Sequence, residues 1–322
     1  MKLSIKNVMV TAVIILAASA LYLYTQAAKM PAPSWHMINV NSGKLQGDAN
    51  LLIVGDETVM IDAGYASEAR IAVIPYLKKL GIKKIDHFFI THPHRDHYEG
   101  LAVILGAGIP IKNLYYKVPA SDIKDCCYNK TDFLKFIRYA EERGAKLIQP
   151  QTGFKLSLPE GSTLELLHAQ EGNLPDVKFD VNDMSMIMKW YVNGSTVLFP
   201  GDLNMKLGSI LSGDKRMRSD FLKMPHHGAE SLAPNAFFDT VKPSAVLVPG
   251  PDWVWCSERG ARPGKWTITR KVPTWVNGIN GNIKVEFNRD GAMITPERTD
   301  GRCKLRAFGV MLIKNENRLT LN

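Results

Sequence analysis

Cysteine is scarce in this 322-residue chain, and the few positions where it occurs limit the sites that it can build. None of the four cysteines has the short paired spacing of a zinc knuckle, so they are poor candidates for metal ligands. In an oxidising compartment they are expected to form one or two disulfides. A bond between the neighbours Cys126 and Cys127 would be strained, so we expect a link from this pair to Cys256 or Cys303.

Tandem repeats and low-complexity tracts are absent. Hydrophobic residues make up 45% of the chain and charged residues 22%, which is typical of an ordinary globular protein able to bury a full core. Acidic residues are fewer than basic ones, and the formal net charge is +9. This balance favours anionic partners such as phosphate esters, nucleic acid or an acidic surface, although charge alone does not choose among them.

Charge is missing altogether from residues 7–28, which follow Lys2 and Lys6. A basic start, an apolar segment and then small residues are typical of a bacterial export signal, with candidate cleavage sites at residues 18–20 and 25–27. The apolar run is long for a signal and short for a spanning helix, so an uncleaved anchor is the alternative. With basic residues on the starting side, either form exports the rest of the chain.

Two regions therefore follow from the sequence. We predict a signal peptide or membrane anchor plus linker over residues 1–34, and a globular domain over residues 35–322. The domain is expected outside the cytoplasm, whether periplasmic, secreted or membrane-anchored. Membrane contact is expected through the N-terminal segment if it stays uncleaved.

Short β-prone runs and helical segments alternate along both halves of the chain. Helices are predicted over residues 67–80 and 132–143, each followed by a glycine. The dipeptide Asn193-Gly194 predicts a tight hairpin turn. Strand groups mixed with helices indicate two sheets with helices outside them. The strands are predicted at residues 37–40, 51–54, 58–61, 184–192, 195–199, 221–224, 245–248, 283–287 and 292–295.

Five of the eight histidines lie in two short clusters. The first cluster follows an apolar, β-prone run at residues 87–90, which places it in the turn that leaves a buried strand. Three imidazoles and a carboxylate within six positions are the ligand mix that zinc and neighbouring first-row metals select. The members of this cluster are His92, His94, Asp96 and His97.

The second cluster is the pair His226-His227, which directly follows a predicted strand and precedes Gly228. Two adjacent imidazoles at a strand end are a moderately specific signal for metal binding or acid–base chemistry. Asp202 stands at another strand end, beside Gly201, and its carboxylate could bridge two cations. The two clusters and Asp202 together indicate one shared site.

These motifs resemble those of the metallo-β-lactamase superfamily of αββα metallohydrolases, over residues 37–296. The chain is most similar to the branch that includes the soluble hydrolase domain of bacterial competence DNA-uptake channels. Residues 60–64 resemble the first motif, whose Asp62 supports the metal loop, and residues 277–283 resemble the terminal asparagine- and glycine-rich turn. The resemblance implies an α+β fold, a four-layer αββα sandwich preceded by the apolar leader.

The resemblance also implies two divalent metal ions, Zn²⁺ first and Mn²⁺ as the alternative. His92 and His94 would bind one ion and Asp202 would bridge. The second ion would take Asp96, His97 and one of the pair His226 and His227. Asp96 would also orient the attacking hydroxide. The histidine of the pair that is not a ligand, with His227 a candidate for either role, would donate a proton or hold a substrate oxygen.

The chain departs from the superfamily at the third motif, where a histidine usually completes the first metal site. His168 is the only histidine between the second and fifth motifs, and we interpret it as structural. The matching region is residues 182–185, where Asp183 could ligate and Asn182 or Ser185 could act through water. A more carboxylate-like first site favours a harder ion such as manganese.

The function predicted from these features is an exported metal-dependent hydrolase that cleaves phosphodiester or related ester bonds with a metal-bound hydroxide. The substrate would be an anionic ester, with single-stranded nucleic acid and a phosphorylated surface polymer as candidates. The alternatives are phosphorylcholine esterase, lactonase or β-lactamase activity, or a non-catalytic metal-binding module at the cell surface.

Two further features bear on the substrate. Lys223 could face a substrate phosphate or point into solvent. Several tryptophans near the expected site could hold a quaternary ammonium group, although we favour a role in the core. They are Trp253, Trp255, Trp266 and Trp275.

Overall fold

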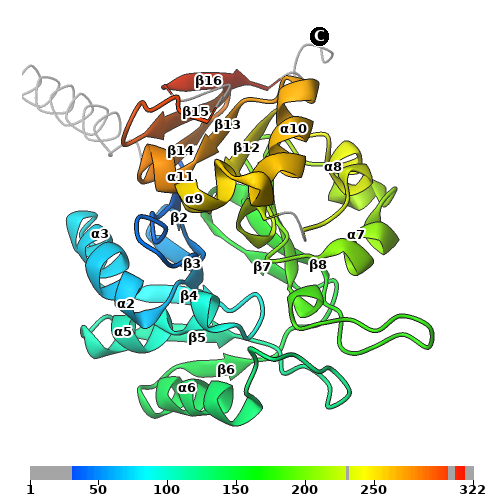
Figure 1. The fold of residues 1–322 in the computed structure, drawn as a ribbon. Helices are drawn as coiled ribbons and strands as arrows, with labels where there is room; N and C mark the ends of the chain where they lie inside the picture. Colours follow the sequence, from blue (N-terminus) through cyan, green and yellow to red (C-terminus); the bar gives the residue numbers. More distant parts are fainter. Residues whose placement is uncertain (1–30, 230–231, 304–308, 316–322) are drawn as a thin grey trace, which may run out of the picture. The chain divides into compact units, whose positions relative to one another are not determined.

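Two β-sheets packed face to face organise this chain in a computed structural model that describes residues 31–229, 232–303 and 309–315 (Figure 1). The chain divides into two units, Met1–Ala32 and Pro33–Asn322, and the fold reported below is that of the second. The predicted leader and linker at residues 1–34 lie almost wholly outside the described residues. No helix in the described ranges is long and apolar enough to cross a membrane.

The first sheet has nine described strands. Its strands from β3 to β6 are parallel to one another, and the strands from β16 to β3 are antiparallel. In spatial order they are β16 (Met311–Lys314), β15 (Gly291–Pro296), β14 (Ile283–Asn288), β1 (Ser34–Met37), β2 (Ala49–Val54), β3 (Glu57–Ala63), β4 (Ile85–Phe89), β5 (Ile111–Tyr115) and β6 (Lys146–Ile148).

The second sheet has seven described strands. It is parallel from β13 to β10 and antiparallel from β10 to β7. In spatial order they are β13 (Thr274–Val276), β12 (Ala245–Val248), β11 (Phe221–Lys223), β10 (Ser195–Phe199), β9 (Ile187–Val192), β8 (Thr163–His168) and β7 (Lys155–Ser157).

Helices and single helical turns connect these strands. The α-helices are α2 (Ala66–Glu68), α3 (Ile74–Lys79), α4 (Arg95–Tyr98), α5 (Gly100–Gly106), α6 (Lys130–Glu142), α7 (Met205–Leu211), α8 (Asn235–Val241), α9 (Asp252–Trp255), α10 (Ala261–Arg270) and α11 (Asn277–Asn280). A π-helical turn, η1 (Ala69–Val73), joins α2 to α3. The 3₁₀ turns are η2 (Pro159–Gly161), η3 (Asn182–Met184), η4 (Lys215–Met217), η5 (His226–Gly228) and η6 (Glu258–Gly260).

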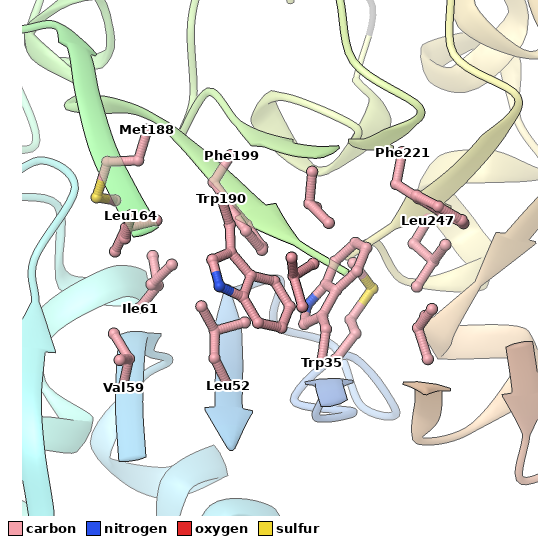
Figure 2. Close-up of a cluster of buried hydrophobic side chains, with 14 of the residues drawn as sticks. Trp35, Leu52, Val59, Ile61, Leu164, Met188, Trp190, Phe199, Phe221 and Leu247 are labelled. Carbon is pink, nitrogen blue, oxygen red and sulfur yellow. The ribbon is translucent and has the colours of Figure 1, made fainter. Parts of the chain in front are cut away.

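The central core lies between the two sheets, where alternate residues of each strand point toward the other sheet (Figure 2). Trp35 of the first sheet meets Phe199 of the second edge to face, with 5.1 Å between ring centroids. The indole N–H groups of Trp35 and Trp190 donate to Asn50 and Ser162, so neither ring buries an unsatisfied donor. This core fixes one sheet against the other.

Each sheet also packs its outer face against helices, which completes four layers. One outer core joins residues of β2–β5 to α3, α5 and α6, and the other joins β10–β12 to α7, α8 and α10 (Figure 1). Residues of β2–β5 and β10–β12 are apolar on both faces because both are covered. The predicted αββα sandwich is confirmed.

Most predicted elements are present, with shifted ends. The helix predicted over residues 67–80 is α2–η1–α3, and the Asn193-Gly194 turn joins β9 to β10 with both residues at positive φ. The strand predicted at residues 37–40 was wrong in its bounds, because β1 ends at Met37. Residues 184–186 are not strand. Met184 is the last residue of η3, and the backbone N–H of Met186 donates to the carbonyl of Thr91.

The predicted disulfide link was also wrong. Cys256 is bonded to Cys303, whereas Cys126 and Cys127 are exposed free thiols with their sulfur atoms 3.1 Å apart. The bonded pair ties the turn after α9 to the segment that follows β15. Sequence spacing alone did not reveal that these two segments are neighbours.

Candidate metal centre

Three strand ends, drawn from both sheets, supply the residues of the predicted site. The first cluster follows β4 of the first sheet, Asp202 follows β10 of the second, and the His226-His227 pair follows β11. These strands are parallel within their sheets, so their carboxyl ends lie at the same edge of each sheet. Loops at that edge bring residues far apart in sequence into one site.

Asp62 holds the first cluster in place. It sits near the end of β3 in a left-handed conformation (φ 58°), and its carboxylate accepts hydrogen bonds from the backbone N–H and hydroxyl of Thr91 at 2.8 and 2.7 Å. The same carboxylate lies 2.8 Å from Nδ1 of His97. Since Nδ1–H donates to Asp62, Nε2 is the nitrogen of His97 that can bind a cation once it is deprotonated, and it points into the site.

Asp202 lies at the centre of the cluster. Its Oδ2 is 3.2 Å from Nε2 of His97 and 3.1 Å from Nε2 of His227. Nε2 of His227 also lies 3.3 Å from Oδ2 of Asp96. Two imidazole nitrogens and two carboxylates that converge in this way are the donor set of a divalent cation.

His92 and His94 form a second pair of converging donors. Nε2 of His92 and Nδ1 of His94 are 3.1 Å apart and face each other. Behind them, Nδ1 of His92 lies 3.3 Å from the Ser185 hydroxyl, and Nε2 of His94 lies 3.4 Å from the Asp125 carboxylate. Each ring therefore has an outer oxygen near one nitrogen and an inner nitrogen for a ligand, although the outer nitrogen of His94 makes no hydrogen bond to a described residue.

The residues fit divalent-cation binding on this evidence. Four imidazoles each place one nitrogen against a hydroxyl, carboxylate or carbonyl and turn the other inward, as metal-bound histidines do. Nε2 of His227 and Oδ1 of Asp202 are buried and make no well-oriented hydrogen bond among the described residues, although Asp202 Oδ2 lies 3.1 Å from the first atom and the Lys223 ammonium 3.6 Å from the second. Buried polar atoms left in that state call for a partner such as an ion.

Burial and mutual charge set the protonation of the centre. Burial and the neighbouring imidazoles lower the pKa of His92 well below its usual value, so this ring is neutral at pH 7. Burial raises the pKa of Asp202, but His227 and His97 outweigh it and hold that pKa well below its usual range. Burial opposes the charged form of His227, yet Asp202 raises its pKa to about 10. The centre therefore combines a carboxylate with imidazoles that a cation would have to deprotonate.

The two histidines of η5 have different positions. Nδ1 of His227 lies 3.1 Å from the carbonyl of Pro249, which leaves Nε2 toward Asp202. His226 lines the open pocket instead, and its Nδ1 lies 2.6 Å from the side-chain oxygen of Asn204. Both histidines have positive φ, 46° and 54°, a conformation that turns the two rings apart. The geometry favours His227 as the inner ligand and His226 as the residue that faces a substrate.

The region of the third motif does not supply a carboxylate. Asp183 accepts a hydrogen bond from the backbone N–H of Asn204 at the start of α7, and burial raises its pKa to about 7. Its carboxylate is not among the described groups that converge on the centre. Ser185 instead accepts from the N–H of Asp202 at 2.9 Å, and Asn182 lines the pocket. The suggestion that Asp183 ligates therefore finds no support in the geometry.

Sequence reasoning missed Asp48 and misjudged Lys223. Lys223 is fully buried and forms an ion pair with Asp48, while its ammonium donates to the carbonyl of Gly201 at 2.9 Å. It also lies 3.6 Å from Oδ1 of Asp202. The lysine therefore points neither into solvent nor toward a substrate, and it supports the turn that carries Asp202. The only sign of a buried lysine in the sequence was its position within an otherwise apolar strand.

An open pocket of about 720 Å³ leads to the centre. None of the four tryptophans lines it: three are buried, and Trp253 is covered in part by Arg259. His168 ends β8 and contacts Gln170, in line with a structural role. The lining residues are Gln46, Tyr65, His94, Arg95, Asp96, Tyr98, Asp125, Cys126, Cys127, Tyr128, Asn129, Asp132, Asn182, Asp202 and His226.

Two curated proteins are similar to this chain. Competence protein ComA of Neisseria gonorrhoeae is 22% identical over 204 residues, which cover 63% of this chain and 25% of that protein. ComE operon protein 3 of Bacillus subtilis (strain 168) is 26% identical over 179 residues, which cover 55% of this chain and 21% of that protein. The chain thus spans a quarter or less of the length of either relative.

A solved structure supports the fold. The metallo-beta-lactamase fold protein YhfI from Bacillus subtilis superposes with a TM-score of 0.51 at 13% identity, over 76% of this chain and 96% of that one. Residues 42–115 match the Metallo-beta-lactamase superfamily, whose members are typically metal-dependent hydrolases. The resemblance predicted from the motifs is confirmed: the chain has the metallo-beta-lactamase fold, carries a segment that matches that superfamily and is similar to competence proteins.

Proposed function

We propose that this protein is an exported hydrolase of phosphodiester or related ester bonds that depends on two divalent cations, zinc in the first instance. The convergence on Asp202 is the observation that carries the proposal. His97 and His227 approach one of its carboxylate oxygens within 3.2 Å, and His92 and His94 face each other nearby. When bound, paired cations would polarise the ester and lower the pKa of a water molecule.

The chain's own residues would divide the remaining work. Asp96 lines the pocket and contacts His227, so its carboxylate can orient an attacking water. His226 also lines the pocket. Its Nδ1–H is donated to Asn204 and burial lowers its pKa, so its other ring nitrogen carries a lone pair that can accept a hydrogen bond or a proton from a water molecule or a substrate hydroxyl. We therefore assign the role of the histidine that faces the substrate to His226 rather than to His227.

An anionic substrate is supported by the charge of the chain, which is +9. Arg95, Tyr65 and Asn129 offer donors to phosphate oxygens at the pocket, but four aspartates also line it, so bound cations would have to supply most of its positive charge. Single-stranded nucleic acid and a phosphorylated surface polymer both present such esters. No tryptophan lines the pocket, so the tryptophans give no support to a phosphorylcholine substrate.

Export is supported by the uncharged stretch at residues 7–28 and by the disulfide between Cys256 and Cys303. Structural disulfides persist in the periplasm and outside the cell and are rare in the cytosol. A periplasmic, secreted or membrane-anchored domain accords with both features.

The test uses full-length protein, purified in mild detergent and loaded with zinc. We expect hydrolysis of bis(p-nitrophenyl) phosphate and of single-stranded DNA, and loss of at least about a hundredfold in His94→Ala and Asp202→Asn. His168→Ala and Asp176→Asn remove the same groups outside the pocket and should keep full activity. Unchanged turnover in both site variants would refute the proposal. Full zinc occupancy without turnover on esters, lactones or β-lactams would instead favour a non-catalytic module.

A further inference from the structure

A second pocket, of about 430 Å³, lies at the opposite ends of the strands that carry the metal centre. Thr196, Phe221 and Ser244 line it at or just before the starts of β10, β11 and β12. Asp202 and the His226-His227 pair follow the other ends of β10 and β11. The two sites are therefore separated by the length of the sheet.

The lining of this pocket is strongly cationic. One carboxylate, that of Asp220, stands among the described lining residues, and it is occupied by the backbone N–H and hydroxyl of Thr196 at 2.8 and 2.7 Å. The five lining cations are Lys189, Lys215, Arg218, Lys242 and Lys314. All of them except Lys189 are exposed, and within the described ranges these four form no ion pair with a carboxylate.

Lys189 is the unusual member, because its ammonium is buried, with only 7% of the residue exposed. It donates to the backbone carbonyls of Arg216, at 3.0 Å, and Arg218. Asp220 and Glu165 act on its charge at longer range, and its ammonium also lies 5.3 Å from the centroid of the Tyr191 ring. Burial disfavours this charge and lowers the pKa of Lys189, so an anion in the pocket would add to the stabilisation that the two more distant carboxylates give.

We propose that this pocket binds phosphate groups. A phosphate offers several acceptor oxygens and about two negative charges, which match a cluster of lysines and one arginine around a compact cavity. Lys215 and Lys314 approach from different elements, η4 and β16, so a bound phosphate would join the end of the chain to the second sheet. The site is independent of the metal centre and of its proposed activity.

Calorimetric titration of the full chain with inorganic pyrophosphate, with and without zinc, tests this site. The double variant Lys215→Glu/Lys314→Glu should bind about tenfold more weakly or worse in both forms, and Lys215→Gln/Lys314→Gln should lose less. The matched variant Lys83→Glu/Lys146→Glu makes the same change in net charge at exposed positions outside the pocket. It should stay within about twofold of the parent protein.

Equal losses in the two Glu variants would overturn the proposal, because they would show only a general charge effect. The proposal would also be overturned if the zinc-free chain bound no pyrophosphate. The same holds if the chain bound vesicles of anionic lipid but no pyrophosphate. A 5′-phosphorylated oligonucleotide distinguishes the sources of phosphate. If its binding falls in the pocket variant but not in Lys83→Glu/Lys146→Glu, the pocket accepts a phosphate on a polymer. If only pyrophosphate responds, the pocket accepts free phosphates.

Discussion

At the metal centre, the protonation of single ring nitrogens decides whether a cation can bind. Without metal, Asp202 raises the pKa of His227 to about 10, and Asp202 and Asp62 raise that of His97 well above its usual value, both against the effect of burial. Both imidazoles are then protonated on both ring nitrogens at neutral pH. Because a ligand nitrogen must be deprotonated, cations and protons compete for the same two atoms.

Metal binding should therefore release protons. We expect about two protons per chain on saturation with zinc near pH 7, and weaker zinc binding as the pH falls. Calorimetry in buffers with different ionisation enthalpies measures the number released. His227→Gln should remove about one proton from the count and weaken binding, whereas His226→Gln should leave the count unchanged. A count near zero in the parent protein would contradict these protonation states.

The buried pair of Asp48 and Lys223 should matter for stability as well as for the site. Lys223→Met would leave the Asp48 carboxylate buried without its cation, at an expected cost of about 3–5 kcal/mol in the free energy of unfolding. The double variant Asp48→Asn/Lys223→Met should recover much of that loss. Urea unfolding of the metal-free parent protein and of the two variants measures these free energies.

An exposed ion pair serves as the control for this prediction. Lys284 lies 2.8 Å from Glu286, with about 40% of the lysine side chain exposed. Lys284→Met should change the free energy of unfolding by no more than about 1 kcal/mol. Similar losses in Lys223→Met and Lys284→Met would show that burial of the first pair has no special weight.

At the scale of elements, the turn after β10 is the most constrained part of the site. Gly201 has φ 55°, and a Cβ atom there would lie 2.5 Å from the Ser185 hydroxyl oxygen. That hydroxyl also accepts from the N–H of Asp202 and contacts His92. A side chain at residue 201 would therefore push apart the groups that hold both halves of the centre.

Gly201→Ala should reduce zinc content and destabilise the chain by about 2–4 kcal/mol, from the strain of positive φ together with the clash. Gly213→Ala is the matched control, because Gly213 also has positive φ, 89°, but nothing lies within 4 Å of its Cβ position. It should cost only about 1 kcal/mol and leave zinc content unchanged. Equal effects of the two changes would assign the loss to backbone strain alone.

The elements show what the sequence could and could not predict. The residues of the first cluster lie within six positions and directly follow the apolar, β-prone run at residues 87–90, so the local sequence placed them at a strand end. The Asn193-Gly194 turn is likewise local. The ion pair of Asp48 with Lys223 could not be predicted. The sequence around Asp48 gives no sign of a buried lysine, and the two residues meet only through packing of the two sheets. Asp183 was misjudged because its role at the start of α7 depends on a contact with Asn204.

At the scale of the whole molecule, the site exists only where the sheets meet. The first sheet supplies His92, His94, Asp96 and His97, and the second supplies Asp202 and His227. The aromatic core between the sheets, with Trp35 against Phe199, fixes the distance between these halves (Figure 2). Metal binding should consequently stabilise the packing of one sheet on the other, since ions that bind only the native state add to its stability.

The cysteines give the last prediction on this scale. Two thiols per chain, those of Cys126 and Cys127, should react with a thiol reagent in unreduced protein, and four should react after reduction and unfolding. Cys256→Ser should lower the stability of unreduced protein by about 2–4 kcal/mol, because the bond to Cys303 closes a long loop. Cys126→Ser should leave stability unchanged, since its sulfur is exposed and unbonded. Peptide mapping that joined Cys126 or Cys127 to Cys256 or Cys303 would contradict this pairing, because the fold holds the two pairs on different segments.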